Sequence, residues 1–311
     1  MAGPHPGGLT SRTAELLARC AFPAAGTPLV CAVSGGPDSL ALLVLAVAAG
    51  CEVTAVHVDH GLRPGSAAEA DVVATAAEAF GAAFRAERVV VADGPDLEAR
   101  ARAARRGVLG PGHATGHTAD DRAETVLLAM LRGTGLDGLG ALRPGPSHPI
   151  VGLRRHETHA LCDAAGLAPV VDPSNVDPRF RRNRVRHEVL PLLDDVAERD
   201  VVPLLCRLAD LASEESDLLG ALAAEGVPDP TDARVVARAP RPLARRALRA
   251  WLRASTDAEQ HPPSAAAVER ALSVARGEAV AADLGGGLHL RRSGQRLRLI
   301  DSESGRQRDD R

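Results

Sequence analysis

Hydrophobic positions along this chain follow two alternating patterns. Compact apolar runs are typical of buried strands, whereas longer stretches with apolar residues every three or four positions are typical of helices. The predicted strands are residues 29–33, 53–58, 84–91 and 113–116. The predicted helices between and around them are residues 9–20, 38–49, 66–80, 97–109 and 120–131. Because strands alternate with helices, we expect the α/β class, with a doubly wound parallel sheet.

The pattern changes after Gly133, and the rest of the chain is mainly helical. Helices are expected near residues 155–165 and then up to about 224, followed by a break at Pro228-Asp229-Pro230. Beyond it, a small α+β domain is predicted, with helices at 242–254 and 264–275 and strands near 279–283, 287–292 and 295–299. The expected organisation is a sheet domain over 1–190, a helical linker over 191–230, a small domain over 231–301 and a disordered tail over 302–311.

Composition excludes several kinds of site. All 37 basic residues are arginine, which excludes lysine Schiff-base chemistry and a Walker P-loop, since both require lysine. The five cysteines include no Cys-x-x-Cys pair, so we predict no zinc site, iron–sulfur cluster or disulfide framework. Aromatic residues make up 2% of the chain, so stacking of bases on aromatic side chains has a small role at most.

Targeting signals and the distribution of charge indicate the expected location of the protein and the kind of partner it binds. No signal peptide is predicted at the N-terminus, and the apolar run 40–49 is too short to cross a membrane, so we expect a cytoplasmic protein without a membrane partner. Residues 234–311 carry a net charge of +7 and residues 1–233 carry −10. A basic C-terminal part suggests a polyanionic partner, although a solvated basic surface explains it equally well. A homodimer is one arrangement that the sequence allows.

A glycine-rich turn between the first strand and its helix is the strongest candidate site. It consists of Ser34, Gly35, Gly36, Pro37, Asp38 and Ser39. Paired glycines allow close approach of a ligand to the backbone, and the following helix N-terminus attracts anions. A carboxylate beside phosphate is repulsive unless a cation lies between them, so Asp38 indicates Mg²⁺. A plain helix-capping turn is the alternative.

Two further loops also follow predicted strands. The first contains His57, Asp59 and His60, whose position suits contact with adenosine, although a polar loop between a strand and a helix explains these residues equally well. The second contains Gly116 and His117 and leads into Asp121 and Glu124, which share one face of a helix. Two such carboxylates suit a cationic substrate group and its proton, although they also favour a helix N-terminus without any ligand.

An arginine-rich segment follows Asp172-Pro173-Ser174-Asn175. Guanidinium groups bind phosphate in bidentate fashion, so this segment is a candidate for contact with a polyanion. A solvated helix face is the alternative. The candidate residues of the segment are Arg181, Arg182, Asn183, Arg184 and Arg186.

The glycine turn resembles the PP-loop signature Ser-Gly-Gly-x-Asp-Ser of the N-type ATP pyrophosphatases. In order along the chain, the motifs resemble those of the bacterial tRNA(Ile)-lysidine synthase family. Besides the glycine turn they are Asp59-His60-Gly61-Leu62-Arg63, the segment Gly116 to Thr125, Arg132 to Leu139, Asp172 to Asn175 and Arg182 to His187. The resemblance implies a Rossmann-like PP-loop ATPase domain within 1–190 and a tRNA-binding role for the basic domain 231–301.

The resemblance also implies a reaction. ATP adenylates the C2 oxygen of the wobble cytidine in tRNA(Ile) with a CAU anticodon, and the ε-amine of free L-lysine then displaces AMP. Asp38, Asp121, Glu124 and Arg182 would be the catalytic residues, with Asp38 holding Mg²⁺ and Asp121 and Glu124 binding lysine. ATP would contact the glycine turn, His57, Asp59, His60, Gly116 and His117. The tRNA would contact Arg181, Arg182, Asn183, Arg184 and Arg186.

This chain departs from the family pattern at several points. The segment 100–109 lacks the usual aromatic residues, and His148-Pro149-Ile150 stands where the family often has Arg-Pro-Leu. The additional C-terminal domain of longer members is not apparent. Two alternatives stay open, namely another PP-loop enzyme such as a tRNA thiolase, and a nucleotide-binding module without catalysis. Thiolases usually carry reactive cysteines, whereas Cys31 and Cys51 lie in or beside apolar strands.

Overall fold

The computed structural model describes residues 6–59, 66–89, 104, 107–170, 172–255 and 263–301. The chain divides into two compact units, Met1–Ser213 and Glu214–Arg311, and each is described by itself. The predicted tail 302–311 and His60 lie outside the described residues, as does most of the predicted helix 97–109. No helix in the described ranges is long and apolar enough to cross a membrane.

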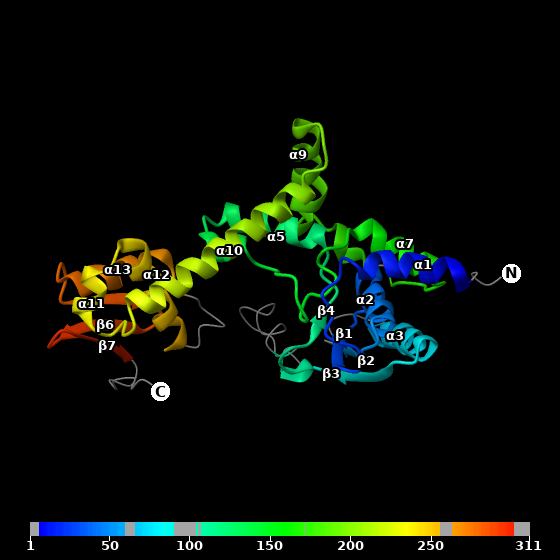
Figure 1. Cartoon of the computed structure of the whole chain (residues 1–311), viewed down its shortest axis with the longest axis horizontal. Coiled ribbons are helices and arrows are strands. Elements are labelled where there is room, and N and C mark those ends of the chain that lie inside the picture. The colour runs from blue at the N-terminus through cyan, green and yellow to red at the C-terminus, as the bar shows by residue number, and fades with distance from the viewer. Residues whose placement is uncertain are drawn as a thin grey trace. The chain divides into compact units, whose positions relative to one another are not determined.

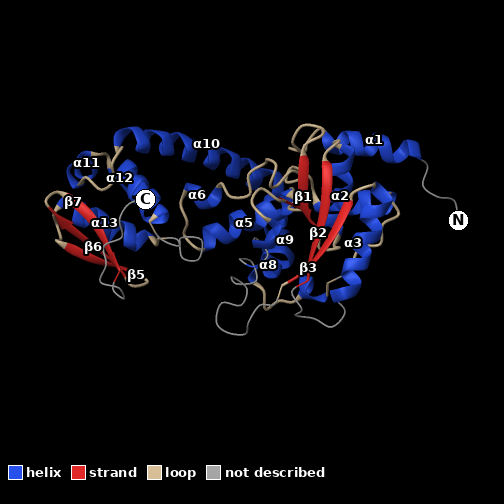
Figure 2. Cartoon of the chain, turned by 90° about the horizontal axis from the view of Figure 1, so that it is seen from below, coloured by secondary structure: helices blue, strands red, loops and turns tan. Residues whose placement is uncertain are grey.

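A parallel four-stranded sheet forms the centre of the first unit, as predicted (Figures 1 and 2). Its order is β3-β2-β1-β4. The strands are β1 (Pro28–Ala32), β2 (Glu52–Asp59), β3 (Ala83–Arg88) and β4 (Ala114–Thr115). The chain moves outward from β1 to β3 and then returns to place β4 on the other side of β1. This reversal makes a switch point between β1 and β4, where ligands of such sheets bind.

Helices α2 (Pro37–Ala48) and α3 (Ser66–Phe80) pack against the sheet and against each other. Right-handed crossovers that advance in one direction place both on the same face. All residues of α2 from Ser39 to Ala46 are buried, because α2 lies between the sheet and α7 (Arg155–Ala164). This double contact explains why α2 is apolar on every side rather than along one stripe.

The remaining helices that begin in the first unit include α10, which continues into the second unit along the chain. They are α1 (Pro6–Leu17), α5 (Ala119–Leu131), α6 (Leu136–Leu139), η1 (Pro173–Val176), α8 (Arg181–Arg184), η2 (Val185–Val189), α9 (Leu190–Ala197) and α10 (Val202–Gly226). The run α8–η2–α9 is continuous but widens to a π-helix at η2, where the N–H of Leu190 donates to the carbonyl of Val185. Pro191 has no N–H to offer to His187, which favours this wider turn.

The second unit has the predicted α+β character. A three-stranded antiparallel sheet has the order β5-β6-β7 and packs with α13 (Ala265–Arg276). Its strands are β5 (Ala281–Gly285), β6 (Leu288–Ser293) and β7 (Arg296–Asp301). Helix α12 (Arg241–Ala254) buries Ala244, Leu248 and Leu252 on one side. Helix α11 (Ala233–Arg238) was not predicted, because six residues are too few to show a helical period.

Candidate active site

A cavity of about 500 Å³ lies at the switch point of the first unit. This volume falls within the range of small-molecule sites. Ser34 and Gly36–Ser39 line it from the loop after β1, and Thr115–His117 line it from the loop after β4. Asp121, Arg155 and Arg186, which belong to helical segments, also line it. The glycine turn after β1 and the loop after β4 therefore meet at one cavity.

The glycine turn is held together by its own hydroxyl groups. The Oγ of Ser39 donates to the carbonyl of Gly36 at 2.8 Å and accepts the N–H of Ser34 at 3.1 Å. Gly35 has a φ of +86°, a conformation that side-chain-bearing residues rarely adopt. Gly36 is the N-cap of α2 and Pro37 occupies its first turn, so the positive end of this helix faces the cavity.

The loop after β4 lies directly on the start of α2. A Cβ at Gly116 would be 2.7 Å from the carbonyl oxygen of Asp38, so only glycine fits there. Helix α5 begins at the next turn, where Thr118 and Asp121 form a capping box. The N–H and the hydroxyl of Thr118 each donate to Asp121 at 2.9 Å. Asp121 is therefore oriented by the local backbone as well as by the groups around it.

Substitution of Gly116 by alanine should force the β4–α5 loop away from α2. We expect a loss of about 1–3 kcal/mol in the free energy of unfolding, typical of overpacking, together with weaker ATP binding. Denaturant unfolding and nucleotide titration would measure the two effects. Gly220→Ala is the matched control, because a Cβ at Gly220 in α10 meets nothing within 4 Å. Equal behaviour of both variants would contradict the close contact at Gly116.

Asp38 faces the cavity from the first turn of α2. The hydroxyl of Thr158 donates to its carboxylate, and the Nε of Arg155 lies 3.6 Å from its Oδ2. Burial raises the pKa of Asp38 and nearby Asp121 adds to the increase, whereas Thr158 and Arg155 oppose it. A cation at this position would stabilise the ionised carboxylate.

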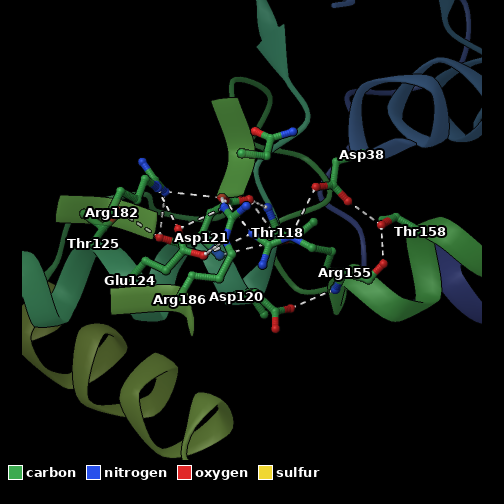
Figure 3. A network of polar contacts seen from close by, with 12 residues as sticks. Asp38, Thr118, Asp120, Asp121, Glu124, Thr125, Arg155, Thr158, Arg182 and Arg186 are labelled. Carbon is green, nitrogen blue, oxygen red and sulfur yellow. Dashed lines mark hydrogen bonds and ion pairs between the residues drawn. The ribbon is translucent and has the colours of Figure 1, made fainter. Parts of the chain in front are cut away.

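Arg155 is placed by the start of α7. The carboxylate of Asp120 accepts the backbone N–H of Arg155 at 2.7 Å and the Nε of Arg154 at 3.1 Å. The Arg155 side chain then extends between Asp38 and Asp121, as Figure 3 shows. Its Nη2 is 3.1 Å from Asp121 and 3.2 Å from Glu124.

Glu124 is the most deeply buried charged residue of this network, with no exposed surface. The Nε of Arg182 donates to it at 2.6 Å and the Nε of Arg186 donates at 2.7 Å (Figure 3). These two arginines lie four residues apart, so both face α5. Burial opposes ionisation of Asp121, but the charges of Arg155 and Arg182 outweigh it and lower the pKa of Asp121. The lowered pKa favours the ionised form of Asp121 within this cluster of carboxylates and guanidinium groups.

Comparison with known proteins identifies the family. Residues 9–193 match the ATP_bind_3 family, a PP-loop domain. The tRNA(Ile)-lysidine synthase of Nocardia farcinica is 44% identical over 245 residues, which cover 74% of this chain and 77% of that protein. This chain belongs to the tRNA(Ile)-lysidine synthase family. The enzyme of the same name from Mycolicibacterium paratuberculosis is 44% identical over 236 residues, or 71% of this chain and 73% of that protein.

A solved structure supports the fold. The U34-tRNA thiolase NcsA from Methanococcus maripaludis is 15% identical and has a TM-score of 0.51, with 67% of this chain and 80% of that one covered. At this identity the likeness concerns the fold alone. The PP-loop ATPase fold expected from the sequence is therefore confirmed by the lysidine synthase relatives and by this structure.

The structure separates the residues expected to bind ATP. Several of them line the cavity, namely Ser34, Gly36, Pro37, Asp38, Ser39, Gly116 and His117. Val56 and Val58 of β2 also line it, whereas His57 and Asp59 do not. Alternate residues of a strand face opposite sides, and the Nδ1 of His57 lies 3.0 Å from the carbonyl of Val33. The side chain of His57 therefore does not face the nucleotide space.

The arginine segment is divided in a similar way. Arg182 and Arg186 are partly buried and pair with the carboxylates of α5. Arg181 is exposed, and Arg184 pairs with Glu188 at 2.7 Å on the surface. The amide of Asn183 donates to the carbonyl of Asp177 at 2.9 Å. In the lysidine synthase fold of this chain, one segment thus contributes both to the cavity wall and to an exposed surface.

Sequence reasoning missed Arg155, Thr158 and His159 of α7, because no local motif marks them.

His148, the histidine that departs from the family pattern, also lies next to the site. The Oγ1 of Thr115 is 2.7 Å from the Nδ1 of His117 and 2.8 Å from the Nδ1 of His148. Burial, followed by the charge of His113, lowers the pKa of His148. This arrangement favours a neutral imidazole beside His117.

Proposed function

We propose that this chain joins free L-lysine to C2 of the wobble cytidine of tRNA(Ile) with a CAU anticodon, in an ATP-dependent reaction that releases pyrophosphate and AMP. The observation that carries the proposal is a single cavity containing both the PP-loop and Asp121. Membership of the tRNA(Ile)-lysidine synthase family supports the same reaction. We also propose a cytoplasmic location, where tRNA, ATP and lysine meet.

The reaction has two steps. The C2 oxygen of cytidine attacks the α-phosphorus of ATP, and pyrophosphate leaves. The neutral ε-amine of lysine then attacks C2, the C2–O bond breaks, AMP leaves, and the amine proton is released. The PP-loop backbone and the hydroxyls of Ser34 and Ser39 would hold the pyrophosphate portion at the N-terminus of α2.

The donor set at Asp38 fits Mg²⁺ bound together with ATP. No cluster of three or more His, Cys, Asp or Glu side chains that could hold a metal occurs among the described residues. Mg²⁺ usually takes one or two carboxylates and completes its shell with phosphate oxygens and water. Asp38 offers one carboxylate beside the PP-loop. When bound there, the ion would neutralise charge on the phosphates.

Asp121 and Glu124 would have different tasks. Asp121 lines the cavity and is the carboxylate that a lysine ε-amine can reach, whereas Glu124 does not line it. The lowered pKa of Asp121 suits binding and orientation of an ammonium group. Glu124 would hold Arg182 and Arg186 in place. Lysine binding would therefore depend directly on Asp121 and indirectly on Glu124.

Sulfur transfer, the nearest alternative, has less support. Cys162 of α7 lies near the PP-loop, where its thiol donates to the carbonyl of Pro37 at 3.2 Å. Burial raises the pKa of Cys162 to about 12, and burial likewise raises the pKa of Cys31 to about 12. Both thiols remain protonated at neutral pH and are poor nucleophiles. A nucleotide-binding module without catalysis would leave the carboxylate–guanidinium cluster unexplained.

Radiolabelled lysine should be incorporated into unmodified tRNA(Ile) with the CAU anticodon when ATP is present. Labelling should disappear without ATP, and also when the wobble cytidine is replaced. A tRNA bearing a different anticodon is the substrate control. If pyrophosphate is released but no lysine is incorporated, the chain uses ATP on another acceptor and the proposal is wrong.

Arginines of the second unit should add to tRNA binding through phosphate contacts. Arg253 of α12 and Arg291 of β6 are exposed. If both bind phosphate, the double variant R253S/R291S should reduce the slope of log affinity against log salt by about 0.7–0.9 for each contact. Fluorescence anisotropy with labelled tRNA over a salt series would measure the slope. Arg207→Ser is the control, because Arg207 is an exposed residue of α10. An unchanged slope in the double variant would remove Arg253 and Arg291 from the interface.

A further inference from the structure

Arg155 is the residue that links the nucleotide half of the cavity to the amine half. Its guanidinium lies 3.6 Å from Asp38, 3.1 Å from Asp121 and 3.2 Å from Glu124. Asp38 belongs to the PP-loop turn, whereas the other two carboxylates belong to α5. One side chain thus contacts the carboxylates proposed to serve ATP and lysine.

Every carboxylate of this cluster has a guanidinium partner before any substrate enters. Three guanidinium groups, those of Arg155, Arg182 and Arg186, face the three carboxylates of Asp38, Asp121 and Glu124. A lysine ammonium that approached Asp121 would add a further cation to a largely buried set whose carboxylates are already paired. Such a charge is costly unless another cation leaves or finds a new partner. One guanidinium must therefore turn away for lysine to bind well.

The distances indicate which guanidinium is most readily exchanged. Arg182 and Arg186 donate to Glu124 at 2.6 and 2.7 Å, and each makes a second contact with the carboxylates of α5. Arg155 reaches Asp121 and Glu124 only through Nη2, at longer distances. Its backbone is anchored by Asp120, so its side chain can turn without movement of α7.

The PP-loop offers the new partner. Arg155 lines the same cavity as Ser34 and Ser39, where the phosphates of ATP would lie. Phosphate is a strong acceptor for guanidinium groups. We propose that Arg155 exchanges partners. Its guanidinium group pairs with Asp121 while the nucleotide space is empty, and it pairs with the phosphates when ATP binds. ATP then prepares the lysine site, an inference that rests on the proposed function.

Equilibrium dialysis of labelled lysine against the full chain tests this coupling. The probe would be Mg²⁺ with α,β-methylene-ATP, which cannot be cleaved at the α-phosphate. We expect this analogue to tighten lysine binding by about 10-fold or more, within the usual range of coupling between two sites. Lysine should tighten binding of the analogue by the same factor, because coupling is reciprocal.

Arg155→Met should remove the coupling, so that lysine binds equally well with and without the analogue. Arg155→Lys, which keeps the charge but loses the guanidinium fork, should give an intermediate ratio, and it serves if the methionine variant does not fold. Arg179→Met is the matched control, because Arg179 is exposed and pairs with Asp177 outside the cavity. This variant should keep the full ratio.

Three results would be decisive. Equal lysine affinity with and without the analogue in the unaltered chain would overturn the exchange. A full ratio in Arg155→Met would also overturn it, since simple attraction between the phosphates and lysine does not need Arg155. Absence of lysine binding under every condition, with tRNA included, would instead contradict the proposed function itself.

Discussion

Replacement of Asp38 by asparagine should reduce the rate of pyrophosphate release by about 10²–10³-fold or more at saturating Mg²⁺. Asparagine keeps the size of the side chain but loses the charge that would hold a cation beside the phosphates. Because Asp38 lies in the first turn of α2 and faces the cavity, we expect the substitution to leave the helix intact. A pyrophosphate-release assay with tRNA(Ile) would measure the effect, and the thermal midpoint would show that the fold is retained.

Asp163→Asn is the matched control for this prediction. Asp163 lies on the exposed side of α7, and the substitution makes the same change of charge and shape. It should release pyrophosphate at the rate of the unaltered chain. Turnover that is retained in Asp38→Asn would remove Asp38 from the proposed metal role. A rescue of that variant by Mn²⁺ would instead support direct contact with the ion.

Replacement of Glu124 by alanine should destabilise the first unit by about 3–5 kcal/mol, the usual cost of removing one partner from a buried ion pair. The side chain has no exposed surface and faces Arg155, Arg182 and Arg186. Without it, Arg182 and Arg186 lose their shortest carboxylate contacts, and of the α5 carboxylates only Asp121 remains to face the three guanidinium groups. The thermal midpoint should fall on the order of 10 °C, as measured by calorimetry or circular dichroism.

The comparison with Glu188→Ala separates burial from simple loss of a carboxylate. Glu188 pairs with Arg184 on the surface, four residues apart on one helix, and its removal should leave the thermal midpoint nearly unchanged. Glu124→Gln should lie between the two, because the amide can accept hydrogen bonds but carries no charge. A small shift in Glu124→Ala would mean that the arginines find other partners, contrary to the closed network.

The network also changes the interpretation of the arginine segment. The spacing of its arginines suggested contact with phosphate, and the structure shows in addition that Arg182 and Arg186 donate to Glu124. Sequence alone could not distinguish these cases, because an amphipathic helix face looks the same whether it meets a phosphate or a buried carboxylate. The deciding factor is the packing of α8 and η2 beside α5, which depends on contacts distant in sequence.

The sequence by itself determined the parallel sheet, the alternation of its four strands with α2, α3 and α5 along the chain, and the position of the PP-loop. These features depend on local signals, namely short apolar runs and glycines at positions such as Gly35 where the backbone requires them. Only the tertiary structure decided that Arg155 and Thr158 reach Asp38, and that Glu124 is buried while Asp121 lines the cavity. The physical reason is that α7 meets α2 more than a hundred residues along the chain, and no local pattern records which side chains such packing brings together.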